Sequence, residues 1–339
     1  MDVPAPVTDP AAIALVEGIV RGDRRALARA LTHVEADSTV GRQVLAALYS
    51  RTGRAQTIGI TGSAGTGKST LAGALAREER RRGRSVGIIA VDPSSPFSHG
   101  AILGDRIRMQ DLTADGGVFM RSMASRGNLG GLSESAGGAI DVLDAAGFDV
   151  VLVETVGAGQ DEVEVANAAG TTVLVTTPAA GDEIQSMKAG LMEVAQIMVV
   201  NKSDLAGADS AVAQLRSLLA IAEHGAWEPP ILKVTARAGE GVADLVDAID
   251  RHQHHIRASE HAPEERRMLA ERQVVALARA ALHREALIAA NANGALAALV
   301  DDVARRTRDP RSAAEALLRA IRSAWASGTR GPEERGPRP

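Results

Sequence analysis

The residues that most clearly suggest a chemical function form a glycine-rich loop. This loop lies between an apolar run (57–61) and a helical pattern that we expect to span 71–82. Its members match G-x-x-x-x-G-K-[ST], and they are Gly62, Ser63, Ala64, Gly65, Thr66, Gly67, Lys68, Ser69 and Thr70. In such a loop backbone N–H groups surround the phosphates, the lysine reaches the β- and γ-phosphates, and the serine hydroxyl ligates Mg²⁺. A loop between a strand and a helix predicts a P-loop nucleotide-binding protein, with Lys68 as a catalytic residue.

A second motif indicates which base is bound. Asn201, Lys202 and Asp204 form N-K-x-D directly after the apolar run 197–200. A carboxylate at Asp204 accepts hydrogen bonds from guanine N1–H and the 2-amino group, a donor pair that adenine lacks, so adenine would leave it unpaired. Lys202 is expected to lie over the base and Asn201 to brace the loop. Three residues after the next run are placed where backbone N–H groups could contact guanine O6: Thr235, Ala236 and Arg237. GTP is therefore favoured over ATP.

Two acidic residues follow apolar runs where a metal would be needed. Asp92 ends the run 86–91, and Glu154 ends the run 150–153. Carboxylates at the carboxyl ends of parallel strands face the nucleotide crevice and are ligands that Mg²⁺ prefers. Either residue could instead cap the turn that follows it. Gly157, three residues beyond Glu154, is placed where its N–H could sense the γ-phosphate. We expect Mg²⁺ to be held by Ser69 together with these carboxylates.

The elements that must position these residues are short apolar runs alternating with helical patterns. Seven runs occur, at 57–61, 86–91, 117–120, 150–153, 172–176, 197–200 and 231–234. Runs that are apolar at every position are typical of parallel strands buried on both faces, and glycine and proline between them disfavour a helical bundle. The pattern predicts an α/β domain over 55–256, with a mostly parallel sheet flanked by helices.

The flanking regions show only helical periodicity. We expect a helical extension at 1–54, a helical arm at 257–327, and a disordered tail at 328–339 that is rich in glycine, proline, arginine and glutamate. An arm after a complete domain favours dimerisation or partner docking, although packing onto its own domain is the alternative. The histidine-rich run 251–255 has no ligand companions at metal-binding spacing, so we interpret it as a solvated helix end. The basic run 78–84 suits a helix C-terminus.

Composition excludes several classes of function. Aromatic residues make up 2% of the 339 residues and the formal net charge is −4, which argues against nucleic-acid or membrane binding. Without cysteine there is no disulfide framework, thiol nucleophile or cysteine-based metal site. The first residues lack a signal-peptide pattern, and the longest apolar runs are shorter than a membrane span. We therefore expect a cytoplasmic protein.

Four motifs in order resemble the GTPase chaperones of methylmalonyl-CoA mutase, whose relatives were formerly named arginine/ornithine transport kinases. The similarity covers about 11–325, and its motifs lie at 92–95, 102–106, 154–160 and 178–190. The resemblance implies that Asp105 is a switch I residue that joins the Mg²⁺ ligands with GTP, and that Glu154 and Gly157 belong to switch II. It further implies a third switch that signals to the mutase, with Asp182, Glu183, Gln185 and Lys188. From the residues alone, that last stretch is only a polar loop and the start of a helix.

The resemblance also implies a function. It implies a Mg²⁺-dependent GTPase, a homodimer through the C-terminal helices, that gates cofactor loading and protects or reactivates an adenosylcobalamin-dependent acyl-CoA mutase without binding cobalamin itself. Two departures concern the site: Ala64 stands where the family commonly has proline, and Ile107 where it commonly has threonine. No obvious arginine finger follows switch II, so we expect slow intrinsic hydrolysis of GTP, ~10⁻⁴–10⁻² s⁻¹. The alternatives are a P-loop kinase or phosphotransferase and a metallochaperone GTPase; missing cysteines disfavour the latter.

Overall fold

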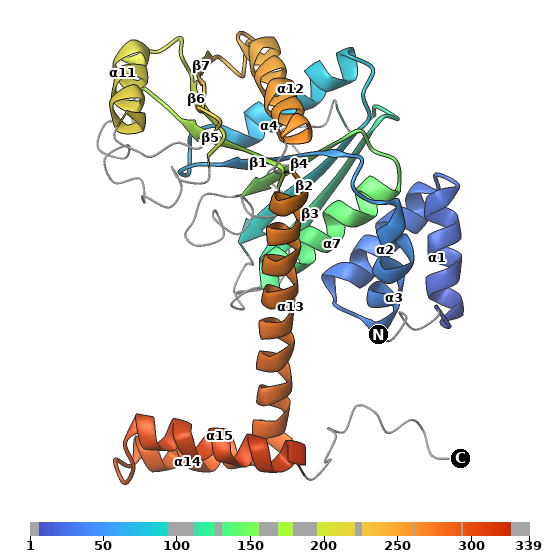
Figure 1. Ribbon diagram of the computed structural model, residues 1–339, viewed down its shortest axis with the longest axis vertical. Helices are drawn as coiled ribbons and strands as arrows, with labels where there is room; N and C mark the ends of the chain where they lie inside the picture. The colour runs from blue at the N-terminus through green and yellow to red at the C-terminus, as the bar shows by residue number, and fades with distance from the viewer. Residues whose placement is uncertain are drawn as a thin grey trace. The chain divides into compact units, whose positions relative to one another are not determined.

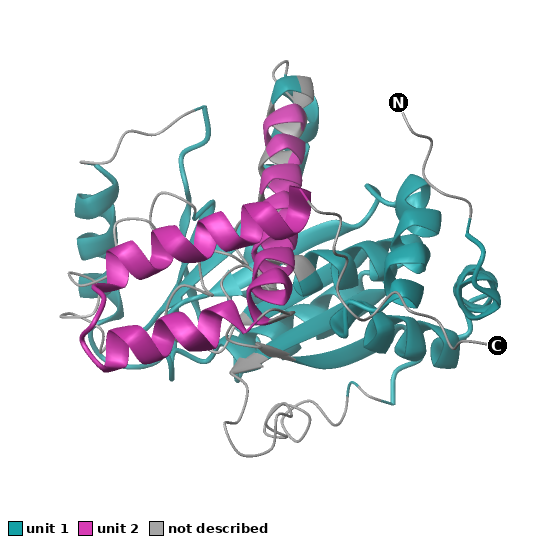
Figure 2. Cartoon of the chain, turned by 90° about the horizontal axis from the view of Figure 1, so that it is seen from below, with its two compact units in different colours: residues 1–264 teal, residues 265–339 magenta. Residues whose placement is uncertain are grey.

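The computed structural model describes residues 7–93, 112, 114–125, 131–155, 169–178, 195–220, 226–259, 262–292 and 294–326. Contacts between residues divide the chain into two compact units, residues 1–264 and 265–339, which Figure 2 shows in different colours. The first unit contains the sheet and the predicted nucleotide site. Among its described residues, the second unit consists of helices and the short turns that connect them.

A seven-stranded parallel sheet forms the centre of the first unit (Figure 1). Its order is β3-β2-β4-β1-β5-β6-β7, and every pair of neighbours is parallel. The strands are β1 (Gln56–Thr61), β2 (Val86–Pro93), β3 (Val118–Ser125), β4 (Val150–Thr155), β5 (Thr171–Thr176), β6 (Ile197–Asn201) and β7 (Ile231–Val234). This sheet confirms the predicted α/β class. Because the strands are parallel, all the loops that follow them meet at one end of the sheet.

One face of the sheet is covered by α4 (Lys68–Arg81) and α12 (Val242–Ala258), as Figure 1 shows. Alternate residues of the central strands point to this face, and they pack with apolar side chains of both helices. The fully buried members include Ile58, Ile60, Leu152, Leu75 and Ile249. We expected the first of these helices to begin at Leu71, but it begins at Lys68, inside the glycine-rich motif.

The opposite face carries two smaller cores. α7 (Gly131–Ala145) packs on β2 and β4 together with the N-terminal helices, and α11 (Ala208–Leu219) packs on β6 and β7. The N-terminal helices are α1 (Pro10–Val20), α2 (Arg24–Glu35) and α3 (Thr39–Leu48), followed by the short η1 (Tyr49–Arg51). Asp9, Asp23 and Ser38 cap the three helices by accepting a backbone N–H, as N-cap residues do. The predicted N-terminal helices are thus present.

The N-terminal helices are joined to the sheet by polar contacts as well. Arg24 donates hydrogen bonds to the carbonyls of Gly116 and Val118, at the start of β3. The carboxylate of Asp144, on α7, accepts N–H groups from Gly53 and Ala55 just before β1. These contacts fix the chain where it enters the sheet.

One interpretation from the sequence is wrong. His252, which we placed on a solvated helix end, is buried on α12, and its Nδ1 lies 2.9 Å from the hydroxyl of Thr171 at the start of β5. Its ring also packs edge-on against Trp227, with centroids 4.8 Å apart. Burial, and secondarily the neighbouring His255, lowers the pKa of His252 to about 4. The ring is therefore neutral at physiological pH.

The second unit contains most of α13 (Ala262–Ala292), together with α14 (Ala295–Ala304) and α15 (Pro310–Ala326). α14 begins after Gly294, which has φ +65°, and packs against α15, which starts at Pro310. Within the described part of the chain, no single helix is long and apolar enough to cross a membrane; the segments 273–291 and 295–304 reach that length together, with a 79° bend between them.

Candidate nucleotide site

The predicted phosphate loop has a backbone that only glycine adopts easily. Gly62, Gly65 and Gly67 have φ values of +137°, +81° and +91°, in the left-handed region that disfavours other residues. A side chain at Gly62 would also place its Cβ 2.1 Å from the carbonyl oxygen of Val175 on β5. Gly67 lies directly before α4, whose first turn directs N–H groups at the loop. A glycine backbone of this kind, directly before the N-terminus of a helix, is suited to binding phosphate.

Lys68 is folded back into this loop. Its side chain is buried, and Nζ donates hydrogen bonds to the carbonyl oxygens of Gly62 (2.5 Å) and Ser63 (2.9 Å). The same Ser63 carbonyl accepts the Thr66 hydroxyl at 2.9 Å, and Thr66 is itself buried. Of the other motif residues, Ala64 and Thr70 are exposed. The ammonium group is thus held by two carbonyl groups of the loop itself.

Ser69 and Glu154 meet at the start of α4. The Ser69 hydroxyl donates to the Glu154 carboxylate at 2.5 Å. Glu154 is buried on β4, in register with Ile60 of β1 and Ala90 of β2, so the sheet fixes its position. A hydroxyl and a carboxylate are hard oxygen donors, which fit Mg²⁺. Among the described residues, which include neither the Asp92 side chain nor Asp105, no group of three or more His, Asp or Glu side chains could hold a metal ion.

Asn201 joins the phosphate loop to the predicted guanine loop. Its amide Nδ2 donates to the carbonyl of Thr66 at 2.8 Å, and its Oδ1 accepts the backbone N–H of Ala236 at 3.1 Å. This side chain is buried, and it lies so close to Gly67 that a Cβ there would be 2.6 Å from Nδ2. The sequence predicted a bracing role for Asn201, and these contacts give it two partners.

The other residues of the predicted guanine site lie in the two loops that follow β6 and β7, next to the Asn201 amide. Lys202, with φ +55°, donates from Nζ to the carbonyl of Gly65 at 2.8 Å. The hydroxyls of Ser203 and Thr235 lie 3.1 Å apart and connect the two loops, a contact that the motif did not predict because any residue fits its third position. Asp204 and Arg237 are exposed, and Asp204 makes no hydrogen bond or ion pair with the described residues. Its carboxylate is open to a ligand.

Several predicted site residues lie outside the described residues. They are Asp105, Gly157, Asp182, Glu183, Gln185 and Lys188, together with Ile107. Asp92 lies on β2, beside Ala124 of β3, but its side chain is not described. The structure therefore brings together the phosphate loop, Glu154 and the predicted guanine loop.

The comparisons with known proteins agree on one family. The family model described as "Methylmalonyl Co-A mutase-associated GTPase MeaB" matches residues 27–291. A Pyrococcus horikoshii protein named as a putative GTPase is 44% identical over 314 residues, 91% of this chain and 97% of that protein. The mouse protein "Methylmalonic aciduria type A homolog, mitochondrial" is 34% identical over 264 residues, which are 72% of this chain and 64% of the mouse protein.

A solved structure covers nearly the whole chain. The crystal structure of an LAO/AO transport system kinase superposes with a TM-score of 0.69 at 26% identity, over 93% of this chain and 99% of the other. The shared fold therefore includes more than the nucleotide-binding core.

Proposed function

Because the chain belongs to the MeaB family of methylmalonyl-CoA mutase-associated GTPases, we propose that it is a Mg²⁺-dependent GTPase that acts as a chaperone of an adenosylcobalamin-dependent acyl-CoA mutase. In this role, GTP binding and hydrolysis by the protein gate the loading of the cofactor and the protection or reactivation of the mutase. The mouse relative, whose name refers to methylmalonic aciduria, supports a mutase as the partner. Methylmalonyl-CoA mutase is the first candidate.

The observation that carries the nucleotide assignment is the double contact of Asn201. One amide binds the phosphate loop through Thr66 and the guanine loop through Ala236, so both halves of a nucleotide site are fixed relative to each other. Lys202 adds a second connection, to Gly65. Asp204 is left exposed beside them, where a carboxylate discriminates guanine from adenine.

Hydrolysis on this site is a matter of positioning and charge. Lys68 would exchange its two carbonyl partners for β- and γ-phosphate oxygens and so stabilise the charge that develops on them. Ser69 and Glu154 would hold Mg²⁺ with Asp92 and Asp105, and the ion when bound neutralises phosphate charge. The backbone N–H groups of the loop and of Gly157 would orient the γ-phosphate for attack by water.

The switch segments would signal to the mutase whether GTP or GDP is bound. Gly157 follows β4, and the segment that contains Asp182, Glu183, Gln185 and Lys188 follows β5, two strands that flank β1. Since β1 leads into the phosphate loop, the carboxyl ends of β4 and β5 lie on either side of the strand that carries this loop. A change there can therefore reach a partner that contacts either segment.

The test is the rate of GTP hydrolysis with and without the mutase. Alone, the chain should turn over GTP at ~10⁻⁴–10⁻² s⁻¹, as unassisted GTPases do, and added methylmalonyl-CoA mutase should raise this rate. A pull-down against candidate mutases with GTP and with GDP identifies the partner. Turnover at tens per second that does not respond to any mutase would reject the switch model.

The kinase alternative predicts a different product. The LAO/AO structure is named as a kinase, so labelled γ-phosphate should be followed into both products. Release as free phosphate supports the GTPase; transfer to arginine or to a protein supports a phosphotransferase. The metallochaperone alternative needs a metal site, and the sequence has no cysteine to build one.

We further propose that the C-terminal helices form a homodimer. Exposed apolar side chains occur along α13, among them Val274 (65% exposed) and Leu282 (54%), and Val300 and Trp325 are exposed on α14 and α15. Such surfaces are typical of protein–protein contacts. Val274→Lys should convert a dimer to a monomer in light scattering, whereas Glu271→Lys, on the same helix, should not. A wild-type chain that is monomeric at micromolar concentration would contradict the dimer.

A further inference from the structure

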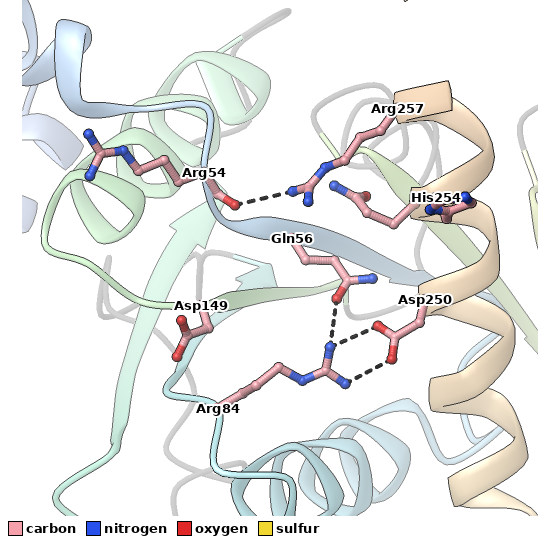
Figure 3. A pocket seen from close by; sticks show the side chains of 8 residues that line it. Arg54, Gln56, Arg84, Asp149, Asp250, His254 and Arg257 are labelled. Atoms are coloured by element: carbon pink, nitrogen blue, oxygen red, sulfur yellow. Dashed lines mark hydrogen bonds and ion pairs between the residues drawn. The ribbon is translucent and has the colours of Figure 1, made fainter. Parts of the chain in front are cut away.

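A polar pocket of about 310 Å³ lies at the amino end of the sheet, the end opposite the phosphate loop (Figure 3). Residues at or just before the starts of β1, β2 and β4 form one wall, and the last turns of α12 form the other. The lining residues are Arg54, Gln56, Arg84, Asp149, Asp250, Gln253, His254 and Arg257. β1 begins at Gln56 and reaches the phosphate loop about 17 Å away, so this is a separate site.

The lining carries an excess of positive charge, with three arginines against two aspartates. Both carboxylates already have partners. Asp250 pairs with Arg84 through two hydrogen bonds of 2.8 and 3.1 Å, and Asp149 accepts the N–H and the hydroxyl of Ser85, both at 2.7 Å. The Ser85 N–H holds the pKa of Asp149 below its usual range, so this group is ionised and satisfied.

Arg257 has no such acidic partner. Among the described residues its guanidinium makes one long hydrogen bond, 3.4 Å to the carbonyl of Arg54. The Arg54 side chain points away from it in Figure 3 and also lacks an ion pair with the described residues. The uncompensated charge of the pocket is therefore on the Arg54–Arg257 side.

Gln56 supplies a donor without an acceptor. Its side chain is 6% exposed; Oε1 accepts from Arg84 at 3.4 Å, which fixes the orientation of the amide, and Nε2 has no hydrogen-bond partner. In Figure 3 this nitrogen points toward α12. A buried amide N–H without an acceptor costs about 1–3 kcal/mol, so an acceptor in the pocket would recover free energy.

We propose that this pocket binds a small oxyanion, the carboxylate or phosphate group of a metabolite, between Gln56 and Arg257. The oxyanion accepts from the Gln56 amide and neutralises the arginine. The volume is at the lower end for small-molecule sites, which limits the ligand to a compact molecule. This proposal goes beyond the GTPase activity and does not depend on it.

The test is anion-dependent thermal stabilisation of the full chain. Inorganic phosphate and succinate are titrated separately at constant ionic strength, with Mg²⁺ and a non-hydrolysable GTP analogue filling the phosphate loop. At ten times the dissociation constant, Tm should rise by about 2–4 °C. A shift with phosphate alone assigns a phosphate group, a shift with succinate alone assigns a carboxylate, and a shift with both assigns the shared oxyanion chemistry.

Two variants in the pocket and one control outside it locate the binding. Arg257→Gln should weaken it at least tenfold without changing Tm in the absence of anion, because the side chain has no other strong contact. Gln56→Glu should abolish it, because a carboxylate replaces the donor. Arg251→Gln, on α12 outside the pocket, should bind as the wild type does.

Two results would overturn the proposal: no saturable shift with either anion, or equal shifts in the wild type and Arg257→Gln. Repeating the titration in Lys68→Ala without nucleotide keeps this test independent of the GTPase. A chain that failed to bind GTP could still show the anion-dependent shift there.

Discussion

The two ends of the same sheet are stabilised by different kinds of contact. At the carboxyl end, Lys68, Asn201 and Lys202 donate to backbone carbonyls of the phosphate loop. At the amino end, side chains pair with side chains: Arg84 contacts both Glu79 and Asp250. A neutral carbonyl is a weaker partner for a cation than a carboxylate or phosphate, so it can be replaced when an anionic ligand arrives.

The two ends of the sheet differ in whether a ligand can replace the partners of their charged groups. The carboxyl end holds its cations on partners that a nucleotide can displace, which suits a site that fills and empties. At the amino end, Arg84 is held by the carboxylates of Glu79 and Asp250, and Arg82 adds a contact of 2.7 Å from the end of α4 to Asp247 of α12. Substitutions at the carboxyl end should therefore affect nucleotide chemistry, and substitutions in the ion pairs of Arg82 and Arg84 at the amino end should affect folding.

The largest effect is expected at the carboxyl end. Lys68→Ala should reduce kcat/KM for GTP at least 10³-fold, ~4 kcal/mol, because the charge that faces the transferring phosphate is lost. Single-turnover hydrolysis measures this loss. The midpoint of urea unfolding should remain near that of the wild type. A variant that keeps activity within tenfold would break the assignment.

The next effect belongs to the amino end. Arg84→Met leaves Glu79, which is fully buried, without its ion pair, and should lower the free energy of unfolding by about 3 kcal/mol. GTP affinity should change less than threefold. Arg251→Met, on the exposed side of α12, is the control for urea denaturation. Glu79→Gln in the Arg84→Met background should recover part of the loss, since no buried carboxylate remains.

Asp204→Asn tests the guanine contact. The variant loses a charged acceptor for guanine N1–H and the 2-amino group, so GTP affinity should fall about 30-fold, ~2 kcal/mol. Titration with a fluorescent GTP analogue measures the affinity. Because Asp204 is exposed, stability should not change. Equal affinity in the two proteins would remove Asp204 from the site.

The smallest effect is a pH dependence at the amino end. The pKa of His252 is lowered by burial to about 4, from 6.5 in the unfolded chain, so the unfolded state binds the extra proton. Its contribution is fully present above pH 6.5 and is lost as the pH falls toward 4, about 2 kcal/mol by pH 5. His252→Gln should show less of this loss in urea unfolding at pH 7.5 and 5. The same loss in both proteins would assign it to other groups.

The fold class could be predicted from the sequence, and so could the phosphate-loop and guanine-loop residues that the structure brings together. The apolar runs identify the strands because parallel strands are buried on both faces. Lys68 and Asn201 could be found because each lies in a motif of consecutive residues. His252 was misjudged because its partners, Thr171 and Trp227, are distant in the sequence. The start of α4 was placed three residues late because glycines at the phosphate loop suggested a longer turn.

The sequence by itself determined the class of the molecule and the chemistry at the carboxyl ends of its strands, because a phosphate loop requires particular residues at consecutive positions. Only the tertiary structure decided what happens at the amino ends. There Gln56, Arg84, Asp250 and Arg257 come from separate segments, and they meet because parallel strands bring all their starting points to one end of the sheet. No spacing in the sequence encodes such a meeting, so the unpaired Nε2 of Gln56 is found only where the last turns of α12 lie beside the start of β1.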